Sequence, residues 1–540
     1  MQSFVASYLG ARDGVARAIR WLANRPLLIF LVGIALCLRL ATVLWGVPGG
    51  PDGALHADET KYLSPATWFI SYYLTEKPFP LYGTSLQYTV GFFLAPFDVL
   101  SRLTDSRESY AFFANVFCRV VVVILGVLAV VLMYRLAERL FDRRTAAFAA
   151  TFLTIAPYHA LNSSWFTIDV PMATLLLVNM LLILSLMHRD RPALYAWWGL
   201  AFGYMLGMKL TAGLFLVFPM VLALTGEGPM RLSRWRRLPV FGGVALATFA
   251  MLNPQFFLAF DRFIERVALD KIDFWDRHAP DTWIEVVAMQ WEGYVGGVGA
   301  PIVLAAIAGI GLAGKRQPRV TLALACLLLA YGLYFRHYML ARYTIFVTPV
   351  LCMFAGVFCA ALVNNVGVRM RIVGVAVLLG VVAATAYLTA GGIVSRWFDP
   401  RPQSARFIAS EYPPGTTVAF GIDSEEYADT HPWRFPALYR ADHRKVGLLE
   451  APTVVVTSSG VMDAIQNALG SEFLAADYSW SPEADDWWYR YSPPSPALFA
   501  FYERLLREED YRLVKTFELP VSEDLAAEFL ITEIRVYERR

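Results

Sequence analysis

A short polar segment at residues 56–63, HADETKYL, carries side chains of the types that catalyse group transfer. Asp58 and Glu59 are adjacent carboxylates, and Lys61 and Tyr62 follow closely. A carboxylate beside an acceptor hydroxyl can act as a general base, and a Lys can stabilise negative charge on a departing phosphate. The segment follows an apolar run long enough to cross a bilayer, so this chemistry is predicted at a membrane surface.

Further ionisable residues lie beside apolar runs, and we take them as candidates for substrate binding. They are Asp169, Lys209, Arg336, His337 and Arg342. The distribution of arginines places all of them on the external side of the membrane. A protein that relays protons would instead bury such groups in mid-helix. The pattern predicts a site at the outer leaflet that serves an amphiphilic substrate.

These side chains suit the transfer of a sugar from a lipid phosphate. The carboxylate would act on an acceptor hydroxyl, and the Lys and Arg side chains would bind the phosphate as it leaves. The lipid tail would lie between helices while the phosphosugar reaches the loop. A lipid-phosphate leaving group needs no nucleotide site, and we find no P-loop or Rossmann signature.

The composition is that of a polytopic membrane protein. Of the 540 residues, 57% are hydrophobic, 14% aromatic and only 17% charged, whereas ordinary soluble domains carry about 25% charged residues. The five cysteines all lie in apolar runs, which argues against a disulfide framework. The basic N-terminus precedes an apolar run that lacks a small-residue cleavage site, so we expect an uncleaved anchor.

Apolar runs of about 20 residues predict membrane-spanning helices. The eleven predicted spans are 27–47, 112–134, 145–161, 169–187, 193–208, 210–225, 238–258, 295–313, 319–335, 343–363 and 372–393. Basic clusters precede the first span and follow the second, fourth, sixth, eighth and tenth. All of them fall on one side if the N-terminus is cytoplasmic. We therefore expect a cytoplasmic N-terminus.

The predicted fold class is a polytopic α-helical membrane protein with a C-terminal extracytoplasmic α/β domain. Residues 85–103 should be interfacial or re-entrant, because one more crossing would scramble the arginine pattern. The first external loop then covers 48–111, and loops of this length are often functional. Residues 1–395 form the transmembrane module. In 396–540, helix-like segments alternate with the β-type runs TTVAFGI, PTVVVTSS, YRLVKTFEL and FLITEIRVY, which predicts a periplasmic α/β domain.

Several motifs occur in an order typical of one enzyme superfamily. They are Asp58-Glu59 with Lys61 and Tyr62, a PLYG stretch, Arg119 with the basic turn RLAERLFDRRTAAFAA, Asp169-Val-Pro, GLAFGYMLGMKLTAG, and Arg342-Tyr343. The chain thereby resembles polyprenyl-phosphate-dependent glycosyltransferases of the GT-C fold, which include protein O-mannosyltransferases and the aminoarabinose transferases that modify lipid A. The likeness covers residues 27–225 well and 330–350 moderately.

The resemblance implies a GT-C-like helical module and a polyprenyl-phosphate sugar donor, with a glycan, glycolipid or protein as acceptor. Together with the modest loop sizes, it also implies a bacterial inner membrane with a periplasmic C-terminal domain. It implies Asp58 as the catalytic base, with Glu59 in support. The residues that it places near the donor phosphate are Lys61, Tyr62, Lys209 and Arg342. Aminoarabinose transferases usually carry Arg where this chain has Lys61, which speaks against that subgroup because an Arg fork and a Lys point charge are not interchangeable.

Each candidate also has a structural interpretation. Asp58 and Glu59 could begin a helix, where acids interact favourably with the helix dipole. Asp169 lies just before Pro171, which is also a natural helix start. Lys209 and Arg342 could extend to lipid headgroups without any catalytic role.

Two functional alternatives concern metals and transport. The external histidines lack ligand spacing, so we expect no required metal, although carboxylates beside a phosphate donor would suit a divalent ion. The competing function is a lipid or solute transporter with an external sensor domain. A transporter would be expected to show repeat symmetry, a broken helix at corresponding positions of its two halves, and charges in the middle of the bilayer. The sequence shows none of these clearly, and nothing in it suggests a nucleic-acid partner.

Overall fold

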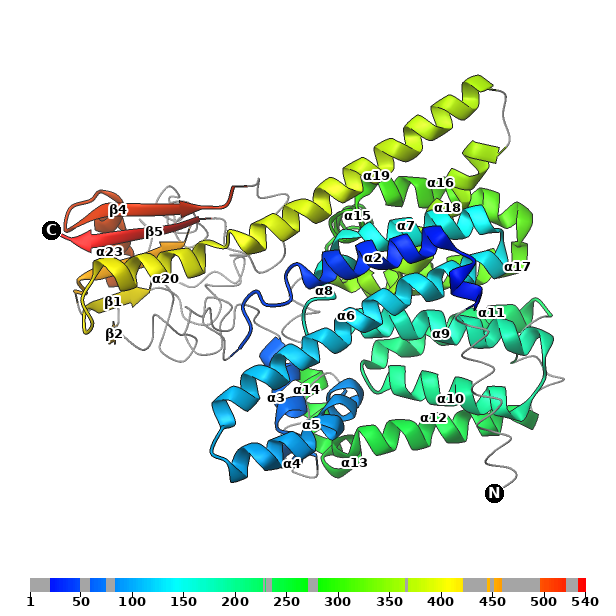
Figure 1. Ribbon diagram of the computed structural model, residues 1–540, viewed down its shortest axis with the longest axis horizontal. Coiled ribbons are helices and arrows are strands. Elements are labelled where there is room, and N and C mark those ends of the chain that lie inside the picture. Colours follow the sequence, from blue (N-terminus) through cyan, green and yellow to red (C-terminus); the bar gives the residue numbers. More distant parts are fainter. Residues whose placement is uncertain are drawn as a thin grey trace. The chain divides into compact units, whose positions relative to one another are not determined.

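The computed structural model is mostly helical, with a small sheet near the C-terminus (Figure 1). The described residues are 20–48, 59–73, 83–226, 229, 236–270, 280–364, 368–420, 444–446, 451–458, 496–520 and 533–540. They form two compact units. The helical unit comprises Met1–Val43, Lys61–Asp105 and Phe117–Ala390, and the sheet unit comprises Leu44–Thr60, Ser106–Val116 and Gly391–Arg540.

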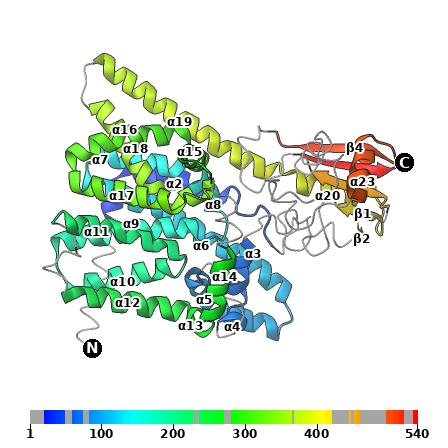
Figure 2. The same ribbon diagram turned by 180° about the vertical axis from the view of Figure 1, so that it is seen from behind.

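Helices lie within every predicted span, although α2 ends at Leu40 whereas the first predicted span runs to residue 47 (Figures 1 and 2). In chain order they are α2 (Pro26–Leu40), α6 (Arg107–Leu140), α7 (Arg143–Ile155), α8 (Pro157–Asn162), α9 (Asp169–His188), α10 (Pro192–Leu206), η1 (Leu210–Leu216), α11 (Val217–Leu224), α12 (Leu238–Leu252), α13 (Pro254–Leu258), α16 (Ala300–Arg316), α17 (Pro318–Tyr334), η4 (Ala341–Phe346), α18 (Thr348–Asn364) and α19 (Val368–Trp397). The connecting segments add α3 (Glu59–Thr67), α4 (Phe69–Tyr72), α5 (Ser85–Leu103), α14 (Phe260–Asp270) and α15 (Trp283–Val298).

Within the described residues, three continuous helical runs are long and apolar enough to cross a membrane by themselves. They are α6, α9 and the run Arg371–Glu411, which includes most of α19. The pair α15–α16 meets the same criterion only as a bent pair, and several other spans are shorter helices. The predicted number of eleven full spans is therefore not confirmed. Helix α5, predicted to be interfacial or re-entrant, is not among the described helices that meet the criterion.

Breaks in the helices explain this difference. Ala156 separates α7 from α8, and Asn253 separates α12 from α13. The span predicted at 295–313 begins instead at Ala300, because α15 and α16 meet there at 110°. The hinge residue Gly299 has a φ of +95°, which glycine adopts readily and other residues rarely do. Hydropathy could not locate these breaks, because a bent apolar run has the same composition as a straight one.

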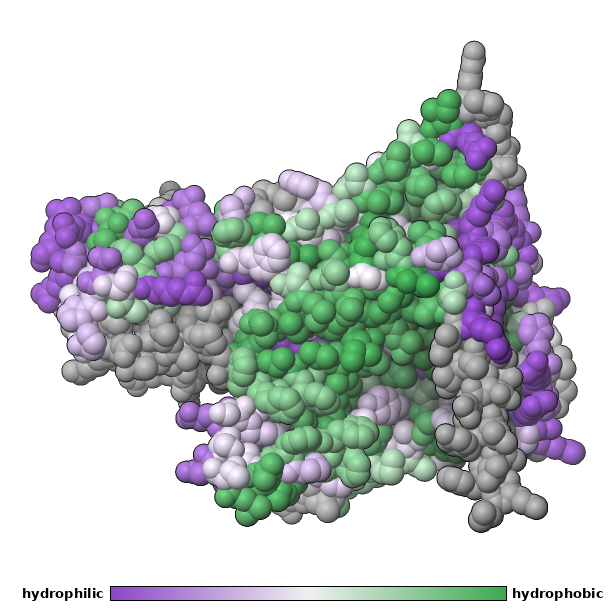
Figure 3. Space-filling view, viewed as in Figure 1, coloured by the Kyte–Doolittle hydropathy of each residue, from purple (hydrophilic) through white to green (hydrophobic). Residues whose placement is uncertain are grey.

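The basic loops gather at one end of the helical unit, which we call the basic end. Three ion pairs join them: Arg25–Glu138 at 2.8 Å, Arg237–Asp190 at 3.3 Å and Arg316–Asp142 at 2.9 Å. Figure 3 shows hydrophilic side chains there, beside a broad hydrophobic surface. The arrangement supports the predicted sidedness of these loops.

One of these acids, Asp142, also begins a helix. Its side chain accepts a hydrogen bond from the backbone N–H of Thr145 and so caps α7. Partial burial raises the pKa of Asp142, but the hydrogen bonds from Thr145 and Arg316 outweigh this effect and leave the pKa below its ordinary value. The carboxylate therefore stays ionised at neutral pH and links α7 to the end of α16.

Helices α10 and α12 pack with their backbones in close approach. A Cβ atom added at Gly203 would overlap the backbone oxygen of Ala245, and one added at Gly199 would lie 2.5 Å from the backbone oxygen of Phe241. Small residues permit such contacts between helices in a membrane. Beside them, Trp198 stacks on Phe241 with ring centroids 3.8 Å apart. This packing fixes the C-terminal end of α10, from which Lys209 follows.

The sheet unit contains a five-stranded mixed sheet with strand order β2-β1-β3-β5-β4. The strands are β1 (Thr417–Phe420), β2 (Arg444–Val446), β3 (Val454–Ser458), β4 (Tyr511–Glu518) and β5 (Glu533–Arg539), with the helices α20 (Pro400–Glu411) and α23 (Pro496–Leu506). Strand β1 is parallel to β2 and β3, whereas β5 is antiparallel to β3 and β4. The four predicted β-type runs all contain strands, and β2 was not predicted.

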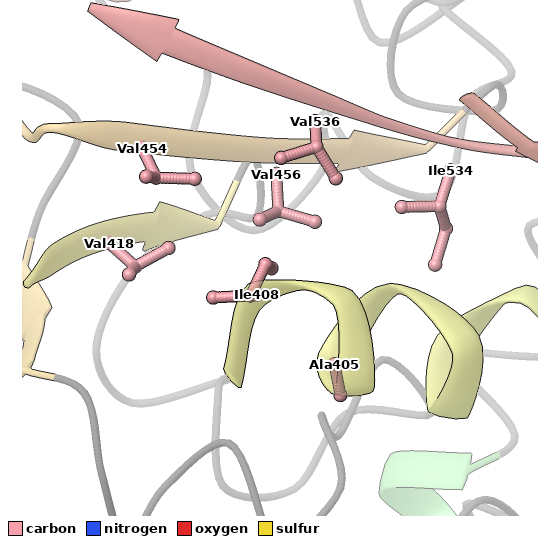
Figure 4. Packing of buried hydrophobic residues seen from close by; sticks show 7 residues of the cluster. All are labelled: Ala405, Ile408, Val418, Val454, Val456, Ile534 and Val536. Carbon is pink, nitrogen blue, oxygen red and sulfur yellow. The ribbon is translucent and has the colours of Figure 1, made fainter. Parts of the chain in front are cut away.

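Helix α20 covers one face of this sheet (Figure 4). Its residues Ala405 and Ile408 are buried against apolar side chains of three strands. Those side chains are Val418, Val454, Val456, Ile534 and Val536. Val454 and Val456, alternate residues of the valine run in β3, lie on this face, as expected because successive side chains of a strand point to opposite faces.

The contact between α10 and α12 gives a testable prediction. Gly203→Ala should destabilise the protein by about 1–3 kcal/mol, the usual cost of forcing extra atoms into a packed contact. The measurement is the thermal unfolding midpoint in detergent, which should fall.

The matched control is Gly243→Ala on α12, where an added Cβ would meet nothing within 4 Å. Its midpoint should stay the same or rise slightly, because Ala favours helices more than Gly. Equal midpoints for the two variants would contradict the close approach at Gly203.

Candidate functional site

Three of the sequence-predicted residues lie together near Tyr343. Asp169 begins α9, Lys209 lies between α10 and η1, and Arg342 precedes Tyr343 in η4. We call these four residues the Tyr343 cluster. Helix α9 spans about 30 Å between Asp169 and the basic end, given a rise of about 1.5 Å per residue. The cluster therefore lies at the opposite end of the helical unit, which we call the site end.

The Tyr343 cluster combines charge with an aromatic face. The Nζ atom of Lys209 lies 3.7 Å from Oδ1 of Asp169, and the two side chains are only 13% and 15% exposed. The same Nζ lies 4.6 Å from the centroid of the Tyr343 ring, and Cζ of Arg342 lies 5.5 Å from it. Two cations and one carboxylate leave one formal positive charge. Partial burial weakens solvent screening, so an anion at this position would interact strongly with both cations.

Contacts with α15 and α17 hold η4 in place. The hydroxyl of Tyr331 in α17 donates a 2.6 Å hydrogen bond to the backbone oxygen of Tyr343. On α15, a Cβ added at Gly297 would overlap Thr344 of η4. The ring of Phe335 stacks on Tyr343 with centroids 4.9 Å apart. The position of Arg342 is thus set by backbone contacts around a short helical turn.

A second set of backbone contacts holds the segment that carries Lys209. The N–H of Ser85 donates to the backbone oxygen of Gly207 at 3.1 Å, and a Cβ at Gly83 would overlap that same oxygen. Asn253 completes the junction, since its side chain accepts from the N–H of Thr84 at 2.7 Å and donates to Ser85 Oγ at 3.1 Å. Gly83 ends the PLYG motif and Gly207 lies in GYMLGMKLTAG, so two motifs distant in sequence meet here.

The other predicted site residues lie in two further places. Asp58 lies outside the described residues. Glu59 is the first residue of α3 and is buried, whereas Lys61 is exposed and Tyr62 is buried on the same helix. Between α17 and η4, Nε of Arg336 donates to Nε2 of His337 at 2.8 Å on the surface. That the residues of the first loop, Arg336 and His337 form one site with the Tyr343 cluster stays a prediction.

Sequence reasoning missed a buried arginine near the break between α7 and α8. Arg39 has no exposed surface, and its guanidinium donates to the backbone oxygens of Leu153 and Thr154, both at 3.3 Å. Its Nη2 also lies 3.0 Å from Nδ1 of buried His159. Carbonyls at a helix C-terminus carry partial negative charge and suit a cation. The available signal was an arginine inside an apolar run.

A second missed cluster lies in the sheet unit. Trp45 donates a 3.1 Å hydrogen bond from Nε1 to Oδ2 of Asp399, and Arg401 forms a 2.7 Å ion pair with the same oxygen. All three residues are buried, and the guanidinium of Arg396 lies 5.2 Å from the Trp45 ring. Trp45 and Asp399 are so distant in sequence that no local pattern could have paired them.

Among the described residues, no group of three or more His, Cys, Asp or Glu side chains is arranged to hold a metal ion. The expectation that no metal is required remains untested, because Asp58 is not among those residues.

Comparison with known proteins gives one family match. Residues 113–255 match the family described as dolichyl-phosphate-mannose-protein mannosyltransferase. The match includes Asp169 and Lys209, and it confirms the resemblance predicted from the sequence over this range. No curated protein matches the chain.

Two kinds of solved structure align with most of the chain. The oligosaccharyltransferase AglB from Archaeoglobus fulgidus, in complex with an inhibitory peptide and a dolichol-phosphate, is 12% identical, with 95% of this chain and 88% of that chain covered and a TM-score of 0.48. ArnT from Cupriavidus metallidurans, bound to undecaprenyl phosphate, is 16% identical. The alignment covers 82% of this chain and 95% of that chain, with a TM-score of 0.46.

The Tyr343 ring should contribute to stability through its cation–π contacts with Lys209 and Arg342. Each cation–π contact contributes about 0.5–2 kcal/mol. Tyr343→Leu should therefore lower the thermal unfolding midpoint more than Tyr343→Phe, which keeps the ring. Identical midpoints for the two variants in the same detergent would show that the ring does not hold Lys209 and Arg342.

Proposed function

We propose that the protein is an integral-membrane glycosyltransferase that moves one sugar from a polyprenyl-phosphate donor to an acceptor on the extracytoplasmic face. The observation that carries this proposal is the Tyr343 cluster, with two cations at the end of the helical unit opposite the basic loops. The mannosyltransferase-family match over residues 113–255 supports it. The proposed compartment is a bacterial inner membrane with a cytoplasmic N-terminus.

In the proposed reaction the acceptor hydroxyl oxygen attacks the anomeric carbon of the donor sugar. The bond between that carbon and the phosphate oxygen breaks, and the anomeric configuration inverts. The hydroxyl proton passes to Asp58, with Glu59 in support. The polyprenyl phosphate leaves with the bonding electrons and gains one negative charge. Atoms and charges balance without a metal. The alternative is a divalent ion, which Asp58 and Glu59 would help to hold and which would stabilise the charge of the leaving phosphate.

Lys209 and Arg342 would bind the phosphate throughout this reaction. Their charge becomes more favourable as the phosphate gains negative charge, so they stabilise the transition state more than the ground state. Asp169 would orient Lys209 through the 3.7 Å ion pair. We further propose Lys61, Tyr62, Arg336 and His337 as contributors to substrate binding.

The transporter alternative predicts helices broken near the middle of the membrane. The breaks at Asn253 and Gly299 instead lie beside the segments that carry Lys209 and Arg342, as do the short helices η1 and η4. Irregular backbone there suits a surface site better than a central transport path. The position of the breaks therefore favours the enzyme.

The proposed base gives the sharpest prediction for activity. Asp58→Asn should lower the transfer rate by about 10²–10⁴-fold, the usual contribution of a general base. Purified protein in liposomes would receive a panel of polyprenyl-phosphate sugars and acceptors, with products followed by mass spectrometry.

The matched control is Glu108→Gln, which changes an exposed acid at the start of α6. It should transfer at the wild-type rate. Wild-type transfer by Asp58→Asn would remove Asp58 from the mechanism while leaving the reaction class intact.

Phosphate binding gives a second prediction. Lys209→Gln should weaken the binding of a polyprenyl phosphate by about tenfold or more, because hydrogen bonds to charged groups contribute about 1.5–3 kcal/mol. Lys209→Arg keeps the charge and should retain more of the affinity. The measurement is equilibrium binding of the lipid phosphate to detergent-solubilised protein.

Lys315→Gln is the control, because Lys315 is exposed near the basic end. If both Gln variants bind as tightly as wild type, Lys209 does not contact the phosphate.

A further inference from the structure

Helix α15 cannot run in the same direction as α16, the apolar helix that follows it. At Gly299 the chain bends by 110° between the axis of α15 and the axis of α16. The far end of α16 carries Lys315 and Arg316 at the basic end. Spanning helices tilt on average by only about 20° from the membrane normal. With α16 along that direction, α15 runs close to the membrane plane at the site end.

One side of α15 exposes large apolar side chains. Trp283 is 66% exposed, Ile284 82%, Val287 66% and Trp291 43%. We call these four residues the apolar stripe. Their spacing places them on one side of a helix with 3.6 residues per turn. Trp is enriched where membranes meet water, because its ring is apolar and its N–H is polar.

The acids of α15 lie on a different side. Glu285 and Glu292 are separated by two helical turns, which places them on one side, and both are exposed. Glu285 also closes a capping box with Thr282 at the start of the helix. A helix with apolar side chains on one side and acids away from them has the pattern of a helix that lies in a membrane interface.

Helix α16, on the other side of the Gly299 bend, also exposes large apolar side chains. Helix α16 exposes Leu304 by 56% and Ile307 by 58%, as expected for a spanning helix in contact with acyl chains. The stripe begins on the other side of the Gly299 bend. Large apolar side chains are exposed on both sides of the bend, which favours lipid as the occupant of both faces.

A further side of α15 contacts η4. Gln290 donates a 2.8 Å hydrogen bond to the backbone oxygen of Phe335, just before the turn that leads to η4. Gly293 and Gly297 allow close approach of Met339 and Thr344. Helix α15 thus packs against η4, the short helix that contains Arg342 and Tyr343.

We infer that α15 is an interfacial helix that docks on the lipid headgroup–acyl boundary of the outer leaflet through its apolar stripe. Because η4 rests on the same helix, α15 also fixes the depth of Arg342 and Tyr343 relative to the lipid phosphates. That second consequence rests on the proposed function, whereas lipid docking itself does not.

The experiment measures the membrane depth of two positions on α15. A nitroxide is attached to Val287→Cys in the apolar stripe or to Glu292→Cys on the acidic side. Both variants carry Cys37→Ser, because Cys37 is exposed and the other cysteines are buried or half-buried. Electron paramagnetic resonance in liposomes then compares collisions with oxygen, which concentrates in lipid, and with a water-soluble nickel chelate.

The label at Val287 should collide mainly with oxygen, at a depth of about 5–10 Å below the headgroups. The label at Glu292 should collide mainly with the nickel chelate. Two water-exposed labels would overturn the inference, and so would two lipid-exposed labels. Trp291→Cys replaces Val287→Cys if the latter does not fold, as judged by gel filtration. No donor or acceptor is present, so the result is independent of whether the protein transfers sugar.

Discussion

The cost of placing an ionised side chain in hydrocarbon determines where the charges of the helical unit lie. Arginines and their acidic partners gather at the basic end, and the Tyr343 cluster lies at the site end, about 30 Å away along α9. Arg39 is the instructive exception. It is fully buried, and backbone carbonyls and His159 surround its guanidinium. Burial of this charge therefore depends on the broken end of α7.

Glycine makes the site possible by allowing backbones to touch. Gly207 and Gly83 bring the segment before Lys209 against the start of α5, and Gly297 seats η4 on α15. A site built on backbone contacts changes little when side chains rotate, which preserves the distances between its charges. The cations that would bind phosphate are thus held by packed helices, whereas the proposed base comes from the first external loop.

The position of the site suits a substrate that is half lipid and half sugar. Its cations lie at the end of the helical unit, where a lipid phosphate would sit, and the inferred docking of α15 places lipid beside the same η4 turn. A lipid-borne donor would then reach the cations from the membrane, while the acceptor would arrive from water. This arrangement explains why carboxylates would follow directly after the first spanning helix.

The sequence by itself determined the membrane class, the clustering of the basic loops at one end and the four main strands of the sheet, because hydropathy and charge are local properties. It also selected Asp169, Lys209 and Arg342, since polar residues beside apolar runs are conspicuous. Only the tertiary structure decided that Lys209 and Arg342 share the Tyr343 ring while Asp169 pairs with Lys209, that α15 bends by 110° from α16, and that Arg39 is buried. Those features depend on backbone contacts between segments far apart in the chain, and no local pattern encodes such contacts.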